Sequence, residues 1–203
     1  MSPKTPLLGP AEYFASADDP LPVGMAVFAL YVLATVGLGV VSVALLATQP
    51  ADPPATVELL ETVGHVVFIT GIDLGIAIAA VTIVVHRFSG GSFDGTIGWT
   101  LAVVGWSYAP NLLAVPIELA FTIAGNLGES DASAIAVLDL GDGHVAFSST
   151  GVAPIGLIPL LAVTIWSVYI IGYGVAAAND VPVRSAMGVA ILVGIGSLLT
   201  SLL

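Results

Sequence analysis

Polar side chains interrupt two of the apolar runs in this sequence, and they are the first candidates for chemistry. Asp73 lies near the middle of a run that otherwise suits lipid. An acid at that depth costs about 2.5 to 3.5 kcal/mol even on a lenient insertion scale, so it must be neutral, paired or near water. Counted by helix rise, Asp73 falls near the depth of Tyr108 to Leu113 on the next run. The turn around Ser107, Tyr108 and Asn111 is expected to donate hydrogen bonds to Asp73.

A second acid is expected to meet a donor nearer the outer face. His65 falls at the depth of Glu118, although simple solvation is the default for both because they lie close to the interface. Pro110 and Pro116 each remove a backbone donor and clash with the carbonyl four residues earlier, which predicts a bent helix. The bend at Pro110 would bring the donors to Asp73, and Pro116 would bring Glu118 toward His65.

Small and aromatic residues at helical spacing are expected to pack helices rather than to bind a ligand. They are Gly71, Gly75, Ala79, Trp166 and Tyr169. The first three form a ridge that another backbone can approach closely, and Asp73 points away from this ridge. Three roles remain open for Asp73: a hydrogen-bonded core residue, a proton- or ion-linked group, or a contact with a partner or with lipid.

Catalytic and metal-binding signatures are missing from the sequence. It has no cysteine, no His-Glu-x-x-His and no Gly-x-Ser-x-Gly, and Asp73 is single where an intramembrane aspartic protease needs a pair. We therefore expect no enzyme activity, no metal and no cofactor. A nucleic-acid partner is not expected either, because phosphate binding needs clustered positive charge and only three residues are Lys or Arg.

Composition places these residues in a membrane protein. The chain has 203 residues, is 57% hydrophobic and only 8% charged, and has a mean hydropathy of +1.07, whereas about a quarter of a soluble domain is charged. Five runs reach the length of about 20 residues that a spanning helix needs, near 23–48, 63–85, 97–123, 152–178 and 183–203. The fold class predicted is all-α, with five transmembrane helices and a proline-kinked third helix.

The first run could alternatively be a cleaved signal peptide, but it is long and follows acidic residues, which favours an anchor. Residues 1–22 then form a short cytoplasmic or interfacial segment, either a foot on the inner leaflet or a disordered tail, and residues 23–203 form the membrane domain. The outer loop 124–151 contains two short alternating stretches around Gly-Asp-Gly, which predicts a β-hairpin.

Positive charges set the predicted orientation in the cell membrane. One side of the five runs carries all three basic residues, Lys4, Arg87 and Arg184. The loops on the other side contain Asp and Glu but no Lys or Arg. Cytoplasmic loops are enriched in Lys and Arg, so the N-terminus is expected inside and the C-terminus outside. The sequence pI near 4.1, with 14 acidic residues, resembles the usage of halophilic archaeal and other salt-accumulating microbial proteins.

The order of several short motifs resembles the Yip1-domain family of integral membrane proteins. Gly-Gly-Ser-Phe at 90–93 precedes Tyr-Ala-Pro at 108–110, then Trp-Ser-Val-Tyr at 166–169 and Gly-Tyr-Gly at 172–174. Such a resemblance, over residues 5–203, implies a five-helix fold with the N-terminus inside. Eukaryotic members act in vesicle traffic and bind small GTPases, but the short tail and the missing Asp-Leu-Tyr-Gly-Pro motif argue against GTPase binding here.

Two functions are compatible with these patterns. The first is a structural or adaptor role, in which the protein organises membrane or recruits other membrane proteins or itself. The second is a small ion- or proton-linked transporter or channel that uses Asp73 and the broken third helix, since midplane acids and discontinuous helices mark transport sites. A cavity that reaches Asp73 would favour transport, and tight packing around it would favour the adaptor.

Overall fold

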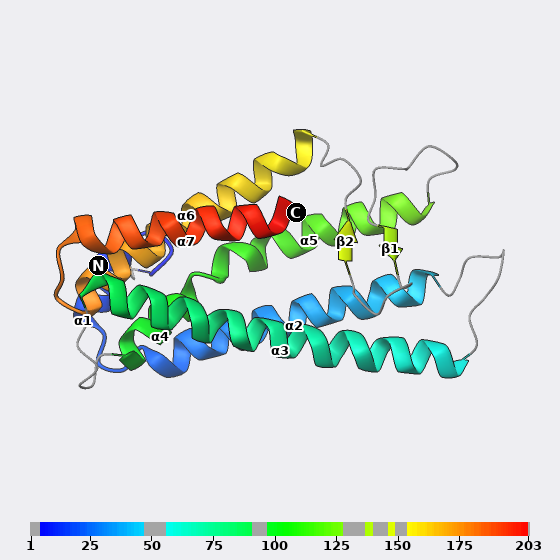
Figure 1. Cartoon of the computed structure of the whole chain (residues 1–203), viewed down its shortest axis with the longest axis horizontal. Helices are drawn as coiled ribbons and strands as arrows, with labels where there is room; N and C mark the ends of the chain where they lie inside the picture. Colours follow the sequence, from blue (N-terminus) through cyan, green and yellow to red (C-terminus); the bar gives the residue numbers. More distant parts are fainter. Residues whose placement is uncertain are drawn as a thin grey trace.

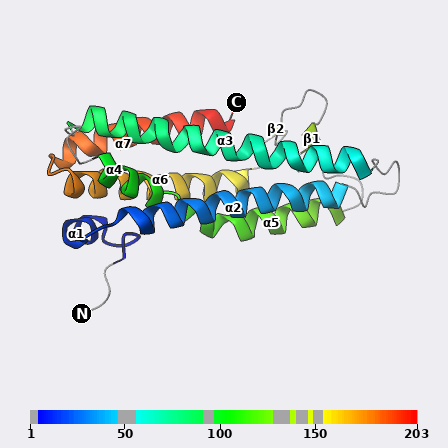
Figure 2. The same ribbon diagram turned by 90° about the horizontal axis from the view of Figure 1, so that it is seen from below.

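The structure is a computed structural model that describes residues 5–46, 56–90, 97–127, 137–139, 146–148 and 154–202. Its helices are α1 Pro10–Ser16, α2 Leu21–Leu46, α3 Thr56–Ser89, α4 Ile97–Trp106, α5 Ala109–Leu127, α6 Pro154–Ala178 and α7 Val183–Leu202, and its strands are β1 Val137–Asp139 and β2 Ala146–Ser148. The long helices run side by side along the long axis of the molecule, as Figures 1 and 2 show from two directions. The short helix α1 lies at one end of this bundle.

Within the described part of the chain, four helical stretches are long and apolar enough to cross a membrane. They are Leu21–Leu45, Val57–Ser89, Ile97–Ile117 and Ile158–Ala178. The apolar part of α7, Val183–Leu199, is shorter. The predicted helical character of the membrane domain is confirmed for the described residues, while a fifth span remains a prediction.

A short antiparallel pair lies between α5 and α6. β1 pairs with β2, with Leu138 opposite Phe147 and Asp139 opposite Ala146. These strands lie in the two stretches for which alternation predicts a hairpin. Residues 124–127 of the predicted outer loop belong to α5, and residues 128–136, 140–145 and 149–151 are outside the described residues.

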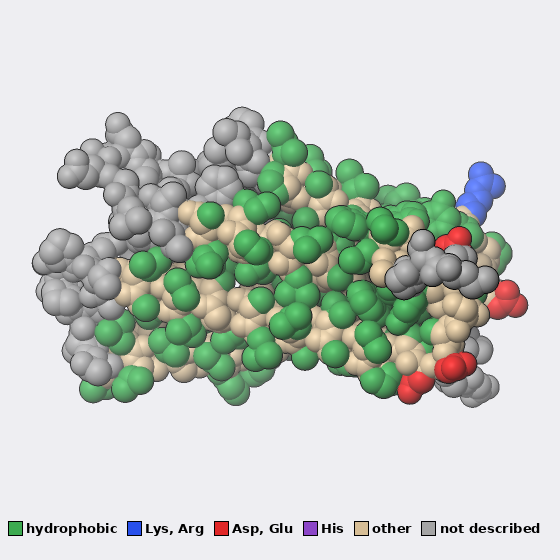
Figure 3. Space-filling view, turned by 180° about the vertical axis from the view of Figure 1, so that it is seen from behind, with side chains coloured by type: hydrophobic (Ala, Val, Ile, Leu, Met, Phe, Trp, Pro, Cys, Tyr) green, Lys and Arg blue, Asp and Glu red, His purple; other side chains and the backbone are tan. Residues whose placement is uncertain are grey.

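The outward surface along the helices is apolar. Leu33 of α2, Ile76 of α3, Ile165 of α6 and Leu192 of α7 are each between 62% and 70% exposed. Figure 3 shows one face of the molecule on which hydrophobic side chains cover the middle and charged side chains gather at one end. Apolar area on this scale is unfavourable in water and is what a lipid-facing surface requires.

The main hydrophobic core lies at the end of the bundle that carries α1. Its buried members come from five helices and are Phe14, Val85, Ala102, Val103, Ile170, Ile171, Val175, Ala176, Ala186, Val189 and Ala190. Most of these side chains are alanine or β-branched, so the helix backbones can approach one another closely. This end of the bundle therefore positions the remaining helices.

The N-terminal segment is part of this core. Phe14 of α1 is 2% exposed, and Trp166 Nε1 on α6 donates to the backbone oxygen of Leu7 at 2.8 Å. Tyr169 Oη, one turn further along α6, donates to the oxygen of Leu8 at 3.2 Å. The two aromatic residues predicted to pack helices therefore also hold the N-terminal segment by hydrogen bonds, and the alternative of a disordered tail is wrong for residues 5–16.

Two glycines allow α2 and α4 to cross backbone against backbone. A Cβ atom added at Gly24 of α2 would lie 2.5 Å from the carbonyl oxygen of Ala102, and one added at Gly105 of α4 would meet the carbonyl oxygen of Gly24. Neither backbone oxygen can swing aside as the end of a flexible side chain can. Any side chain at either position must push the two helices apart.

Substitution of Gly105 by alanine is therefore expected to destabilise the protein by about 1 to 3 kcal/mol, the usual cost of overpacking. The matched control is Gly37→Ala on α2, because an added Cβ there meets nothing within 4 Å. Thermal unfolding in detergent measures both variants. A midpoint for Gly105→Ala equal to or above that of Gly37→Ala would contradict the close crossing.

Candidate functional site

The third predicted span is divided at residues 107 and 108. α4 ends at Trp106 and α5 begins at Ala109, so the structure has two helices where the sequence predicts one helix bent at Pro110. The break precedes the proline, which falls in the first turn of α5, where a missing N–H is tolerated. Pro110 is fully buried, and Pro116 lies inside α5.

A neighbouring helix satisfies a backbone group that the break exposes. The Ser107 amide donates to the oxygens of Val103 and Val104 at 3.0 and 3.1 Å, which closes α4. The Ser107 carbonyl oxygen accepts a hydrogen bond of 2.7 Å from Ser167 Oγ on α6. Because a carbonyl without a partner is costly in apolar surroundings, this contact with α6 stabilises the break.

A cavity of about 100 Å³ lies beside the break and is lined by residues of α3, α5, α6 and α7 as well as by the break itself. Its polar lining is contributed by Ser107, Tyr108, Asn111, Thr164, Ser167 and Ser197. The structure therefore brings the three predicted donors of the third span together. These three residues line a cavity together with residues of α6 and α7, and counting depth along the helices did not predict that contact with α6 and α7.

The cavity is lined by both polar and apolar residues and carries no charge in its described lining. Ser107 Oγ already donates to the oxygen of Val104 at 2.7 Å, and Thr164 Oγ1 donates to the oxygen of Leu160 at 2.8 Å. These hydroxyl groups can still accept hydrogen bonds through their oxygen atoms. The lining suits a neutral hydrogen-bonding guest such as water better than a bare ion.

Tyr108 connects this cavity with α2. Its ring centroid lies 5.1 Å from that of Phe28 and 5.0 Å from that of Tyr31. Aromatic pairs at this spacing add about 0.5 to 1.5 kcal/mol beyond their buried area. The tyrosine therefore packs the break against α2 as well as lining the cavity.

Asp73 does not join the cavity, and the prediction that Ser107, Tyr108 and Asn111 donate to it is wrong. Its side chain is exposed on α3 and is absent from the cavity lining. The buried Thr82 follows it by about two and a half turns at 3.6 residues per turn, so the two side chains project in opposite directions. Helix rise predicts depth alone, whereas the rotation of α3 about its axis leaves Asp73 exposed and away from the cavity.

The small-residue ridge of α3 contacts no other described helix. A Cβ added at Gly71 or Gly75 would meet nothing within 4 Å, and Ala79 is exposed. Its predicted role in packing helices within the chain is therefore wrong for the described residues. His65 is exposed on the same helix, and its predicted partner Glu118 has a side chain outside the described part, so that pairing stays a prediction.

A buried polar network that the sequence did not predict joins three elements near α1. Thr100 Oγ1 on α4 lies 2.9 Å from His86 Nδ1 on α3 and accepts a hydrogen bond of 2.9 Å from Asn179 Nδ2, in the turn after α6. His86 and Thr100 are both 0% exposed. One hydroxyl group on α4 therefore joins the end of α3 to the turn that follows α6.

The signal for this network is weak in the sequence. His86 adjoins Arg87 and Asn179 adjoins Asp180, so both read as ordinary polar residues of a turn. Only Thr100, inside an apolar run, marks the buried side of its helix. Nothing in the spacing indicates that the two turns meet at this threonine.

Comparison of the chain with protein-family models, with curated proteins and with solved structures bears on the predicted family. No match is found in any of the three. The resemblance to Yip1-domain proteins thus rests on the order of the sequence motifs and stays a prediction.

Thr100→Val keeps the shape of the side chain and removes its hydroxyl group. We expect a loss of about 1 to 3 kcal/mol in the free energy of unfolding, because His86 and Asn179 would each lose a buried partner. The control is Thr35→Val on α2, whose hydroxyl bonds only to a carbonyl of its own helix, Tyr31 O at 3.0 Å. Equal unfolding midpoints for the two variants in detergent would show that the network contributes nothing.

Proposed function

We propose that the protein is a multi-pass membrane protein with a structural or adaptor role, which recruits other membrane proteins or organises the membrane around it. The observation that supports this role best is the outward position of Asp73 on α3. An acid displayed on an apolar outer surface is available to a neighbouring protein and unavailable to the interior. The resemblance to Yip1-domain proteins points in the same direction.

The cavity beside the helix break favours transport as a second candidate, because discontinuous helices mark transport sites. Its described lining is neutral, however, and does not include Asp73. An ion route through it would have to run without the one acid in the middle of α3. The adaptor role therefore agrees better with the exposed position of Asp73 and with the uncharged lining of the cavity.

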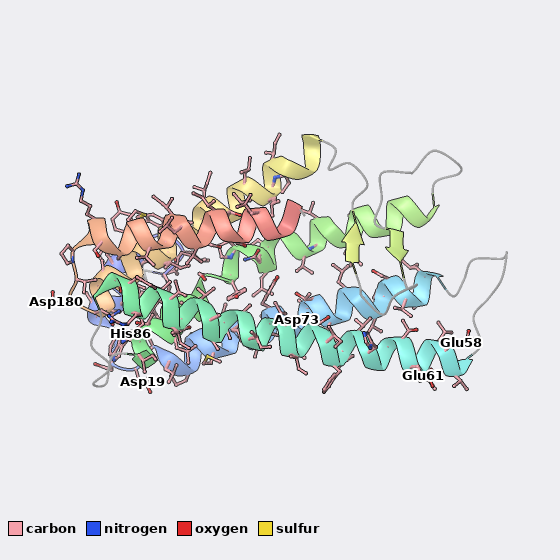
Figure 4. All side chains as sticks on the ribbon, in the orientation of Figure 1. Asp19, Glu58, Glu61, Asp73, His86 and Asp180 are labelled. Carbon is pink, nitrogen blue, oxygen red and sulfur yellow. The ribbon has the colours of Figure 1, made fainter. Side chains whose placement is uncertain are left out.

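The proposed orientation places the end that carries α1 in the cytoplasm. Arg87 and Arg184 belong to the end of α3 and the start of α7, which lie together at that end of the bundle, while Glu58 and Glu61 lie at the other (Figure 4). A Lys and Arg bias toward one end supports a cytoplasmic assignment for it. The acidic composition supports a salt-accumulating, halophilic archaeal type of host.

Orientation can be tested with single cysteines, because the chain has none of its own. We expect Glu61→Cys to react with a membrane-impermeant maleimide in intact cells and Asp18→Cys to react only after permeabilisation. Both side chains are exposed, so a difference between them reports sidedness and not burial. The reverse labelling pattern would overturn the proposed orientation.

The adaptor role predicts contact with another integral membrane protein in the native membrane. Photoreactive side chains at Leu33, Ile76 and Leu192, which are exposed on three different helices, sample the outer surface. We expect a discrete adduct with a second membrane protein from at least one position, and we expect the purified protein to leave a proton gradient across liposomes intact. Lipid adducts alone from all three positions, or a collapsed gradient, would contradict the proposal.

A further inference from the structure

Asp73 lies too deep along α3 for its carboxylate to reach water at either end. Glu61 and Arg87, the nearest charged residues on the helix to either side, are about 18 and 21 Å away at 1.5 Å per residue. Half of the hydrocarbon core is about 15 Å thick. Figure 4 shows Asp73 near the middle of the helix, between the labelled acids at one end and His86 at the other.

The polar group nearest to this carboxylate along α3 is the hydroxyl group of Thr70, about one turn earlier. Ile72 and Ile76 beside it are 41% and 62% exposed, and no described residue forms a hydrogen bond or ion pair with it. An exposed acid at this depth faces lipid tails in the isolated chain. An acid at this depth must be neutral, paired or near water, and another molecule that supplies a donor or a positive charge would provide the pairing.

We propose that the face of α3 around Asp73 docks a transmembrane helix of another protein that carries Lys, Arg or His at the same depth. This inference rests on the adaptor role proposed above and names the chemistry of its partner. Charge complementarity selects the occupant, because a carboxylate and a cation that meet in the apolar core satisfy each other. Ala80, about two turns further along the same side of α3, is small and exposed, so the backbone of a partner helix can approach there.

A second copy of this chain does not supply the required charge. The chain has three Lys and Arg residues, and Arg87 and Arg184 both lie at the end that carries α1. His65 is about 12 Å from Asp73 along the helix. Two copies related by a twofold axis along the membrane normal would instead set acid against acid.

The test uses the full-length protein in phosphatidylcholine vesicles with defined helical probes. Energy transfer measures its association with a Leu/Ala transmembrane peptide of about 20 residues that has one central lysine, and with the same peptide carrying leucine there. We expect association with the lysine peptide to be about tenfold stronger, the scale of a favourable polar contact between membrane helices. Asp73→Asn should lower it to the level of the leucine peptide, and Asp73→Glu should retain it.

Glu61→Gln is the matched control, since it removes one negative charge from an exposed position near the end of α3 and should leave the association unchanged. Equal association of the two peptides, or an unchanged result with Asp73→Asn, would overturn the inference. Energy transfer between two copies of the protein that is lost with Asp73→Asn would also overturn it, in favour of self-association. The peptide experiment tests only the docking of a charged helix at Asp73, and the cross-linking experiment tests the adaptor role. A negative peptide result would therefore not by itself contradict the adaptor role.

Discussion

The close crossing of α2 and α4 at Gly24 and Gly105 is the contact on which the rest of the bundle depends. Because the two backbones touch there, α4 can reach the core only along one line, and the break at its end falls at a fixed height. Tyr108 then packs on α2, and Ser167 of α6 reaches the carbonyl of Ser107. In an apolar medium a helix can be interrupted only where a neighbour replaces the lost backbone bond, so the crossing and the break must be positioned together.

The same requirement explains why the cavity beside the break has no charged residue in its described lining. The hydroxyl groups near the break bond to backbone oxygens, and Thr100 joins an imidazole and an amide at the end that carries α1. Such groups lose little when they leave water, provided each finds a partner. An ionised side chain would lose far more, which accounts for an interior whose described cavity has no charged lining.

Sequence reasoning predicted the elements well and their rotations poorly. Apolar length located the long helices, and the prolines pointed to an interruption of the third span, because both are local properties of the chain. The partners of Asp73 were predicted from depth, which helix rise gives directly, but the side to which α3 turns depends on its packing against several helices at once. The prediction that Gly71 and Gly75 pack against another helix is wrong for the same reason. Gly24 and Gly105 do allow a close contact between helices, but no distinctive spacing in the sequence marks them.

The cavity has no charged lining, whereas Asp73 is exposed on α3, and this difference favours recruitment of a partner over ion transport. A protein that conducts an ion needs its charged groups along an inner path, where water can follow. Here several of the described polar groups inside bond to a neighbouring helix, although Thr82 Oγ1, Trp106 Nε1 and Asn179 Oδ1 have no hydrogen-bond partner. Asp73 is instead exposed on α3, whose buried residues include Thr82 and Val85. Rotating α3 by about half a turn would bury the acid against the core at a high desolvation cost, so packing favours the arrangement that leaves Asp73 to a neighbour.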